Sequence, residues 1–344
     1  MANLTAVLPR PGEIVLEERP EPRPGPRDVV VAVEAVGVCG SDVHYYRHGR
    51  IGSFVVTGPL VLGHEAAGTV VAAGAEAAHP VGTRVAIEPG VPCRRCGQCR
   101  AGSYHLCRDI QFLATPPVDG AFTRLLAVPD DFAHPLPEQL DAEQGALLEP
   151  LSVGIWACRR ADLRPGDRVL ISGAGPVGLL AAEAARALGA GSVTVTEVSP
   201  SRLAVARRRR LDAVVDAAGG LDLAPEFDVL LECSGAPGAL AAGLRCLAPG
   251  GRAAVVGLSN EDEVSLPLGL VHDREVTVGM VFRYAHTWPT AISLAATGRV
   301  DLTGLVSHRF GLAQTEAALT AGATTPDLVK AMVLPPHESL DGAA

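Results

Sequence analysis

The sequence predicts an α/β protein with two domains, an irregular and largely β domain followed by a doubly wound domain built on a parallel sheet. A chain of 344 residues is long enough for two domains and a large buried core. Up to about residue 150, Pro and Gly punctuate short β-branched runs such as Asp28–Glu34 and Gly68–Val71, which is typical of short strands joined by turns. From Asp167 onward, buried strands alternate with helical stretches, as they do in doubly wound folds.

Short apolar runs supply the expected strands of the parallel sheet. Arg168–Ser172 reads as a fully buried first strand, and Leu179–Leu188 as the helix that follows it. Between Arg210 and Phe227 the pattern is short and weak, so the sequence does not define how a third strand and its helix fit there. The other expected strands are Ser192–Thr196, Asp228–Glu232, Arg252–Val256 and Val276–Met280.

The C-terminal part of the chain is expected to return to the first domain. Two late runs, Leu305–Phe310 and Leu328–Leu334, have strand character after a stretch of helical patches. We therefore expect a first domain over residues 1–151, a dinucleotide-binding domain over 152–282, and a return segment over 283–344.

Composition and charge exclude several classes of protein. Apolar residues make up 48% and charged residues 19%, which is a globular composition. The formal net charge of −9 argues against a nucleic-acid partner, and the basic run Arg207–Arg210 is interpreted as a solvated helix face. The first twenty residues contain no apolar signal-peptide core, and no apolar run approaches the roughly 18 residues that span a membrane. We therefore expect a cytoplasmic protein whose eight cysteines serve metal binding or catalysis more than disulfides.

A glycine-rich turn predicts a dinucleotide site. Gly173, Gly175 and Gly178 form a G-x-G-x-x-G directly between an expected strand and an expected helix. The first glycine permits the tight turn, the second lets the backbone approach a pyrophosphate, and the third allows close packing of helix on strand. Pro176 falls early in the helix, where its missing N–H costs little, and the helix N-terminus then faces the phosphates, with Val177 and Gly257 also expected at the cofactor.

The acid that ends the second strand predicts which cofactor binds. Glu197 lies 19 residues after Gly178, where a carboxylate that binds the ribose diol is expected. An acid at this place repels a 2′-phosphate, so NAD is favoured over NADP. Arg202 lies nearby and could soften that preference. The alternative interpretation makes Glu197 an exposed acid at a strand end.

Four cysteines in one short segment predict a metal site. They follow the pattern C-x2-C-x2-C-x7-C, and four thiolates within reach of one ion are typical of a closed structural zinc site. An iron–sulfur cluster of the bacterial ferredoxin type would need C-x3-C-P at the end of the run. A nucleic-acid zinc ribbon usually separates two C-x2-C pairs by a longer spacer. The four residues are Cys93, Cys96, Cys99 and Cys107.

A second set of metal-binding residues is more scattered. Cys39 ends a β-rich run, and His64 and Glu65 follow 25 and 26 residues later within a glycine-rich stretch. Three such ligands leave a fourth zinc position for water or substrate. Each residue alone could be a core thiol, a core histidine or an acid near the metal. Their occurrence beside a four-cysteine segment and a dinucleotide fold favours the zinc site.

These motifs occur in the order found in the zinc-containing medium-chain dehydrogenases, and finer blocks look like the sorbitol dehydrogenase family. The resemblance covers about residues 30–335. It departs at Arg208–Ala213, which lacks the usual Gly-Ala turn, and in keeping all four cysteines, as bacterial relatives do. The blocks that carry the resemblance are Val36–Tyr45, Gly49–Gly52, Ala114–Pro117, Leu148–Gly154, Ala157–Arg160, Val281–Tyr284 and Thr287–Pro289.

The resemblance implies a GroES-like catalytic domain, a Rossmann domain that binds NAD, and one catalytic and one structural zinc ion. It implies catalytic zinc held by Cys39, His64 and Glu65, with Glu149 close enough to bind the metal or its water; whether Glu65 or Glu149 is the third protein ligand stays open. Zinc would make a substrate hydroxyl more acidic, and the carbon that bears this hydroxyl would deliver hydride to NAD. Ser41 and His44 would pass the proton outward, although Ser41 could be only a turn residue.

The resemblance also implies the substrate and the assembly. A sugar alcohol is expected as substrate and a ketose as product, with a homotetramer preferred over a dimer. Dehydrogenation of an aldonate, L-threonine or a simple secondary alcohol is an alternative, and a non-catalytic NAD-binding regulator is a remote one. Arg283 could also be only a solvated loop residue. The residues that match substrate positions in the family are Tyr45, Phe112, Thr115, Glu149, Arg283 and Tyr284.

Overall fold

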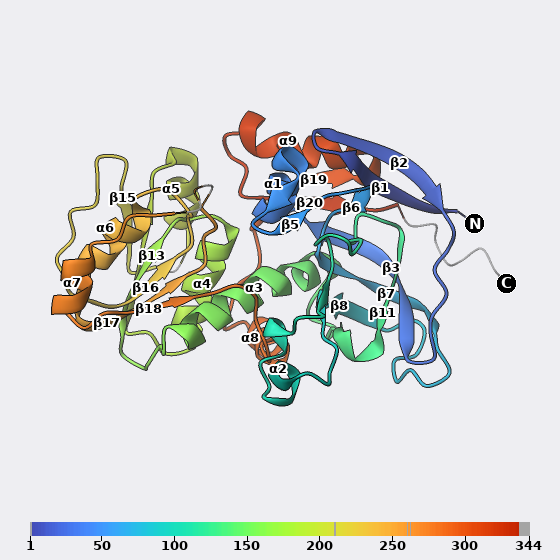
Figure 1. Cartoon of the computed structure of the whole chain (residues 1–344), viewed down its shortest axis with the longest axis horizontal. Coiled ribbons are helices and arrows are strands. Elements are labelled where there is room, and N and C mark those ends of the chain that lie inside the picture. Colours follow the sequence, from blue (N-terminus) through green and yellow to red (C-terminus); the bar gives the residue numbers. More distant parts are fainter. Residues whose placement is uncertain (1, 210, 260, 262, 337–344) are drawn as a thin grey trace. The chain divides into compact units, whose positions relative to one another are not determined.

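The computed structural model describes residues 2–209, 211–259, 261 and 263–336, and it divides the chain into two compact units (Figure 1). The first unit contains the residues up to Glu149 together with those from Thr303 onward, and the second contains Pro150–Leu302. Residues 283–302, expected to begin the return segment, group with the second unit. Residues 337–344, at the end of the expected return segment, lie outside the described residues, and so does Arg210 of the basic run. Each unit is described by itself below.

The first unit is largely β, as the sequence predicts. Its main sheet has the strand order β12-β8-β7-β3-β20-β19, and β11 also pairs with β3. The two late strands do return to this unit, because β20 pairs antiparallel with β3. The strands of this sheet are β3 (Asp28–Gly37), β7 (Glu65–Ala73), β8 (Arg84–Ile87), β11 (Leu125–Pro129), β12 (Ala133–Pro135), β19 (Val306–Gly311) and β20 (Lys330–Leu334).

Smaller elements complete the first unit. A three-stranded sheet in the order β2-β1-β6 packs with β3 and β7 around one apolar core that includes Leu8, Val31 and Phe122. The remaining elements are β1 (Asn3–Arg10), β2 (Glu13–Arg19), α1 (Gly40–His48), β4 (Arg50–Ile51), β5 (Phe54–Val55), β6 (Leu60–Val61), β9 (Gly90–Val91), α2 (Gly97–Arg100), β10 (Gln111–Phe112) and α9 (Thr315–Thr324), with short 3-10 turns at Tyr104–Leu106, Asp130–Phe132 and Leu312–Gln314.

The second unit is the predicted doubly wound sheet. Six parallel strands lie in the order β15-β14-β13-β16-β17-β18, so the chain reverses direction across the sheet between β13 and β16. Ligands of such folds bind beyond the carboxyl ends of the strands at this reversal. The elements are α3 (Ala142–Arg160), which runs in from the first unit, β13 (Arg168–Ser172), α4 (Pro176–Ala187), β14 (Ser192–Glu197), α5 (Pro200–Ala206), β15 (Ala213–Asp216), β16 (Phe227–Glu232), α6 (Ala239–Arg245), β17 (Leu247–Val255), α7 (Leu268–Asp273), β18 (Thr277–Met280) and α8 (Trp288–Ala296).

The region that the sequence left undefined contains a short third strand. β15 pairs parallel with β14 as the edge of the sheet, and the ten residues after it reach β16 without a helix. The solvated interpretation of the basic run holds for Arg207 and Arg208, which are exposed in a turn after α5. It is wrong for Arg209, whose side chain is only 10% exposed and lies 4.0 Å from the carboxylate of Glu183. The run therefore contributes to packing within the unit.

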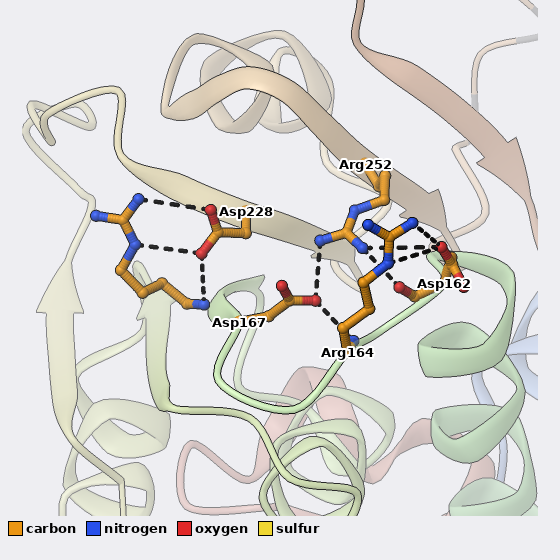
Figure 2. A network of polar contacts seen from close by, with 6 residues as sticks. Asp162, Arg164, Asp167, Asp228 and Arg252 are labelled. Carbon is orange, nitrogen blue, oxygen red and sulfur yellow. Dashed lines mark hydrogen bonds and ion pairs between the residues drawn. The ribbon is translucent and has the colours of Figure 1, made fainter.

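Ion pairs tie together the amino ends of the central strands, away from the glycine-rich turn (Figure 2). The Asp228 carboxylate accepts hydrogen bonds from the backbone N–H and the guanidinium of Arg168, which links the starts of β16 and β13. Arg252 on β17 donates to Asp167, 2.9 Å away. Because these contacts lie at the end opposite the expected ligand edge, we assign them to stability. Arg164 and Asp162 extend the network.

Candidate functional site: a glycine-rich turn and two groups of metal-binding residues

The three glycines of the turn have different surroundings. Gly173 has φ +95°, a left-handed conformation that favours glycine, and it lies against Ser234. A Cβ at Gly178 would lie 2.0 Å from the carbonyl oxygen of Gly173, so only glycine allows helix α4 to pack this closely. A Cβ at Gly175 would meet nothing within 4 Å. Gly175 is the N-cap of α4 and Pro176 opens the helix, which leaves open space at the helix N-terminus for phosphate.

Glu197 is buried at the end of β14, which corrects the alternative interpretation of an exposed acid. Its Oε2 accepts a hydrogen bond from the backbone N–H of Ala174 within the glycine turn, at 2.9 Å. Its Oε1 accepts from the backbone N–H groups of Val198 and Ser199. The side chain is 6% exposed, and the guanidinium of Arg202 lies 4.0 Å from Oε2. Glu197 therefore fixes the glycine turn to the end of the second strand.

A second buried acid at the same edge was missed in the sequence. Glu232 ends β16 and accepts hydrogen bonds from the backbone N–H groups of Ser234 and Gly235. Gly257 packs on this loop so closely that a Cβ would lie 2.1 Å from the nitrogen of Gly235. Glu232 thus holds the loop that touches Gly173. A buried acid directly after the apolar run Val229–Leu231 is the signal that could have identified it.

The four cysteines come together as predicted. Their sulfur atoms all lie within 4.8 Å of one another, with 3.4 Å between Cys96 and Cys99 and 4.0 Å between Cys93 and Cys99. A tetrahedron with metal–sulfur bonds of about 2.3 Å has edges of roughly 3.8 Å, which matches one zinc ion and leaves no room for a cluster between the thiolates. The backbone N–H of Cys99 lowers the pKa of the Cys96 thiol to about 6, whereas burial and the neighbouring thiols raise the pKa of Cys99, so Cys96 is the more acidic of the two.

Polar side chains anchor this four-cysteine loop to the first unit, and none of them was identified from the sequence. Arg94 donates two hydrogen bonds to the Asp131 carboxylate, at 2.5 and 2.7 Å. Tyr104 donates to the buried carboxylate of Glu88 at 2.7 Å, and His134 lies 2.8 Å from the same group. The loop is therefore held at both ends, as a structural site requires.

Strand register brings the second group of metal-binding residues together. β3 and β7 pair antiparallel with Gly37 opposite Glu65, so Cys39, two residues further on, comes beside His64. Cys39 is the N-cap of α1. One ligand atom from each of Cys39, His64 and Glu65 lies within 4.8 Å of the others, and the histidine and glutamate are buried. A soft thiolate, an imidazole and a carboxylate are ligands that zinc accepts.

Asp42 joins the two segments that carry these ligands. Its side chain is buried, and it accepts hydrogen bonds of 2.9 Å from the backbone N–H groups of Cys39 and Gly63. Its Oδ1 lies 3.5 Å from Nδ1 of His64. Burial by itself would lower the pKa of His64, but Asp42 outweighs it and holds that pKa well above the ordinary value. A carboxylate that orients a metal-binding histidine in this way also sets its tautomer.

Lys330 faces the same group from β20. Its ammonium Nζ donates a hydrogen bond to Oε1 of Glu65 at 2.6 Å and lies 2.5 Å from Oε2. It also donates to the carbonyl oxygen of Val38 at 2.9 Å. Burial alone would lower the pKa of Lys330, but Glu65 and then Cys39 outweigh it and raise the pKa above its ordinary value. The ammonium is therefore charged inside the first unit.

The residues present fit a zinc ion by the chemistry of their donor set. Oε2 of Glu65 is already contacted by the Lys330 ammonium at 2.5 Å, but a thiol, an imidazole and a carboxylate still converge within 4.8 Å. This is a set of donors that zinc accepts. Cys39, His64 and Glu65 would hold zinc here, and the four cysteines would hold the structural ion.

The other expected site residues of the first unit lie close to these elements. Ser41, His44 and Tyr45 are on α1, directly after Cys39. Burial and the neighbouring His48 lower the pKa of His44, and the two rings lie 4.7 Å apart. The ring of Phe112 lies 5.8 Å from that of His64. Thr115 follows in the same loop and donates its backbone N–H to the carbonyl oxygen of Phe112.

The remaining expected substrate residues are Glu149 on α3 and, after β18, Arg283 and Tyr284. Glu149 is buried on α3 and carries charge close enough to Lys330 to raise its pKa, which places it near the metal-binding group. Arg283 and Tyr284 follow β18 in the second unit, where the guanidinium of Arg283 lies 4.5 Å from the ring centre of Phe282. Their roles at the substrate stay predictions.

Two protein-family models match this chain. Residues 25–138 match the alcohol dehydrogenase GroES-like domain, and residues 176–297 match the zinc-binding dehydrogenase domain. The sorbitol dehydrogenase of Bacillus subtilis is 43% identical over 91% of this chain and 92% of its own length. That of Bos taurus is 45% identical over 94% of this chain and 93% of its own.

Solved structures agree in fold. A dehydrogenase of unknown specificity from Escherichia coli superposes with a TM-score of 0.93 at 33% identity, covering 98% of this chain and 100% of the other. The chain belongs to the zinc-binding dehydrogenases of the medium-chain type, in the sorbitol dehydrogenase family.

Proposed function

We propose that this protein oxidises a secondary hydroxyl of a sugar alcohol with NAD and gives the ketose and NADH. One observation carries the proposal: ligand atoms of Cys39, His64 and Glu65 converge within 4.8 Å in a chain that also has a complete dinucleotide turn. The sorbitol dehydrogenases of Bacillus subtilis and Bos taurus support a polyol as substrate.

In this proposal the first unit performs catalysis and the second binds NAD. Zinc, when bound, supplies a Lewis acid that makes a hydroxyl acidic enough to lose its proton near neutral pH. Asp42 would keep His64 oriented, and Glu149, which is buried on α3, would contact the metal or its bound water. The hydroxyl of Ser41 and the imidazole of His44 accept the proton and pass it outward along α1.

NAD is expected to bind with its pyrophosphate at the N-terminus of α4. Glu197 then meets the ribose diol while it holds the glycine turn through Ala174. The same carboxylate would repel a 2′-phosphate, so NADP should bind poorly. Arg202 lies 4.0 Å from Glu197, on the side where it neutralises part of that charge.

Substrate choice is assigned to polar groups beyond the metal. Tyr45, Thr115, Arg283 and Tyr284 would receive the other hydroxyls of the polyol, and Phe112 would form an apolar wall beside His64. Buried polar groups built for hydroxyls reject simple alkanols, because those groups would be left unpaired. Glu149 is proposed to contact both the metal and the substrate.

The proposal is tested by following NADH at its absorbance across four- to six-carbon polyols, with L-threonine, an aldonate and 2-propanol as comparison substrates. At least one polyol should give a kcat/KM at least tenfold above that of each of the three comparison substrates. Preference for L-threonine or the aldonate would replace the polyol with that substrate. NADP used as well as NAD would contradict the assignment of Glu197.

We also propose a cytoplasmic homo-oligomer, a tetramer in preference to a dimer. Strand β18 forms one edge of the six-stranded sheet; its last residue, Met280, is 66% exposed, and Phe282, two residues further on, is 57% exposed. An edge strand flanked by exposed apolar side chains is a surface that a partner subunit commonly covers. Light scattering of the purified protein tests this; a monomer at micromolar concentration would contradict it. Among the described residues, the structure contains no helix of the length and hydropathy needed to cross a membrane.

A further inference from the structure

Lys330 and Glu65 form a buried ion pair beside the metal-binding group. A lysine that is 3% exposed contacts a carboxylate that is 1% exposed, and the carboxylate belongs to a residue proposed as a zinc ligand. A metal ion and an ammonium group both bind carboxylate oxygens, so they compete for the negative charge of Glu65. Burial removes the solvent that would otherwise screen the two cations from each other.

The backbone around this pair is shaped to hold both side chains close together. A Cβ at Gly37 would lie 2.0 Å from Oε2 of Glu65 and 2.9 Å from Cε of Lys330. The register that places Gly37 opposite Glu65 therefore provides the space in which the pair fits. The carbonyl oxygen of Val38, the residue before Cys39, accepts a hydrogen bond from Nζ of Lys330 and holds the ammonium in place.

Lys330 contacts both oxygens of Glu65. Its Nζ donates a hydrogen bond to Oε1 at 2.6 Å and lies 2.5 Å from Oε2. A metal ion that binds either oxygen must therefore share the carboxylate with the ammonium. A carboxylate shared in this way gives less charge to the metal than a free one, because part of its charge is already balanced.

We propose that Lys330 is a positioning residue that weakens the hold of Glu65 on zinc and thereby keeps the ion electrophilic. The inference rests on the proposed function, in which Glu65 is a zinc ligand. This role and a purely structural role predict opposite changes in zinc affinity when the charge of Lys330 is removed. If Lys330 only supported the site, removing its charge would loosen zinc and lower turnover together. If it restrains Glu65, removing its charge tightens zinc while turnover falls.

The test compares Lys330→Gln, which keeps a hydrogen-bond donor without charge, with Lys330→Arg, which keeps the charge. Zinc affinity is measured in the holoenzyme by competition with a chelator of known affinity, and the catalytic ion is the one whose loss removes NADH formation. In Lys330→Gln we expect catalytic zinc bound about tenfold more tightly and kcat about tenfold lower. In Lys330→Arg, where the charge remains on a larger group, we expect catalytic zinc to bind no more tightly than in the wild type.

A second pair of variants covers the case in which Lys330→Gln fails to fold because Glu65 is left as a lone buried charge. Glu65→Gln contains no lone carboxylate and leaves a lysine that can lose its proton, and the double variant Glu65→Gln, Lys330→Gln contains neither charge. Because Lys330 acts through Glu65, their zinc affinities should differ by less than about threefold. The structural zinc should be unchanged in every variant and serves as the internal control.

Two results would overturn the inference. One is weaker binding of the catalytic zinc in Lys330→Gln, which would make Lys330 a supporting residue only. The other is a shift of the same size in the Glu65→Gln background, which would mean that Lys330 does not act through Glu65. A wild type that holds no zinc at this site would instead contradict the proposed function, so the two failures are distinguishable.

Discussion

The carboxylate of Asp42 lies 3.5 Å from Nδ1 of His64 and accepts the backbone N–H of Gly63 at 2.9 Å. Asp42 therefore contacts the proposed zinc ligand His64 and also joins the chain segments that carry Cys39 and His64. Carboxylates in this position typically contribute 10- to 100-fold to metal affinity. We therefore expect Asp42→Asn to lower the affinity for catalytic zinc by about that factor, measured by chelator competition. Unchanged zinc affinity would reduce Asp42 to a capping residue of α1.

The four-cysteine loop should contribute to stability and not to chemistry. Cys96→Ser removes one of four converging thiolates, and loss of a structural zinc removes folding free energy. We expect a lower midpoint of urea unfolding and a kcat within about threefold for the protein that remains folded. Cys246→Ser is the matched control, because Cys246 is a buried thiol outside both metal-binding groups. A large loss of kcat without loss of stability in Cys96→Ser would give the loop a catalytic role.

Glu197→Ala should change the choice of cofactor and also weaken NAD binding. The substitution removes the repulsion of a 2′-phosphate, so the KM for NADP should fall and narrow the gap between the two cofactors. It also removes the acceptor for the N–H of Ala174, so the KM for NAD should rise by about tenfold. Glu226→Ala, at an acid 58% exposed in the same unit, is the control and should change neither constant. A preference for NAD that survives Glu197→Ala would place the discriminating group elsewhere.

Arg283→Ala tests the assignment of substrate contacts. Losing a hydrogen bond to a charged group costs about 1.5–3 kcal/mol, so kcat/KM for the preferred polyol should fall by roughly ten- to a hundredfold. A small alcohol such as 2-propanol cannot reach the arginine and should be used as before. Equal losses on both substrates would place Arg283 at the cofactor or in the scaffold, and no loss on either would make it a solvated loop residue.

The elements that the sequence predicts well are those with a strong pattern of burial. β13, β14 and β16 are central strands buried on both faces, and their apolar runs identify them within one residue at each end. β15 could not be predicted in the same way, because it is a four-residue edge strand with half-exposed and exposed side chains. The short connection that follows it carries no helical period.

The metal-binding residues could be predicted because their chemistry is unusual, whereas the residues that support them could not. Lys330 opens a strand whose other residues are apolar, and only the pairing of β20 with β3 brings it to Glu65. Asp42 is one acid within a polar helical turn, and its burial depends on Gly63, 21 residues away. Both side chains act through contacts distant in sequence, and a single sequence contains no signal for such contacts.

The most direct test of the account measures zinc content and NADH formation together in the wild type and in Cys39→Ser. The wild type should hold about two zinc ions per chain and oxidise a polyol with NAD. Cys39→Ser should keep the fold, as judged by its urea midpoint, hold about one zinc ion, and form no NADH above background. Iron in place of zinc, full activity in metal-free protein, or turnover retained in Cys39→Ser would contradict the account.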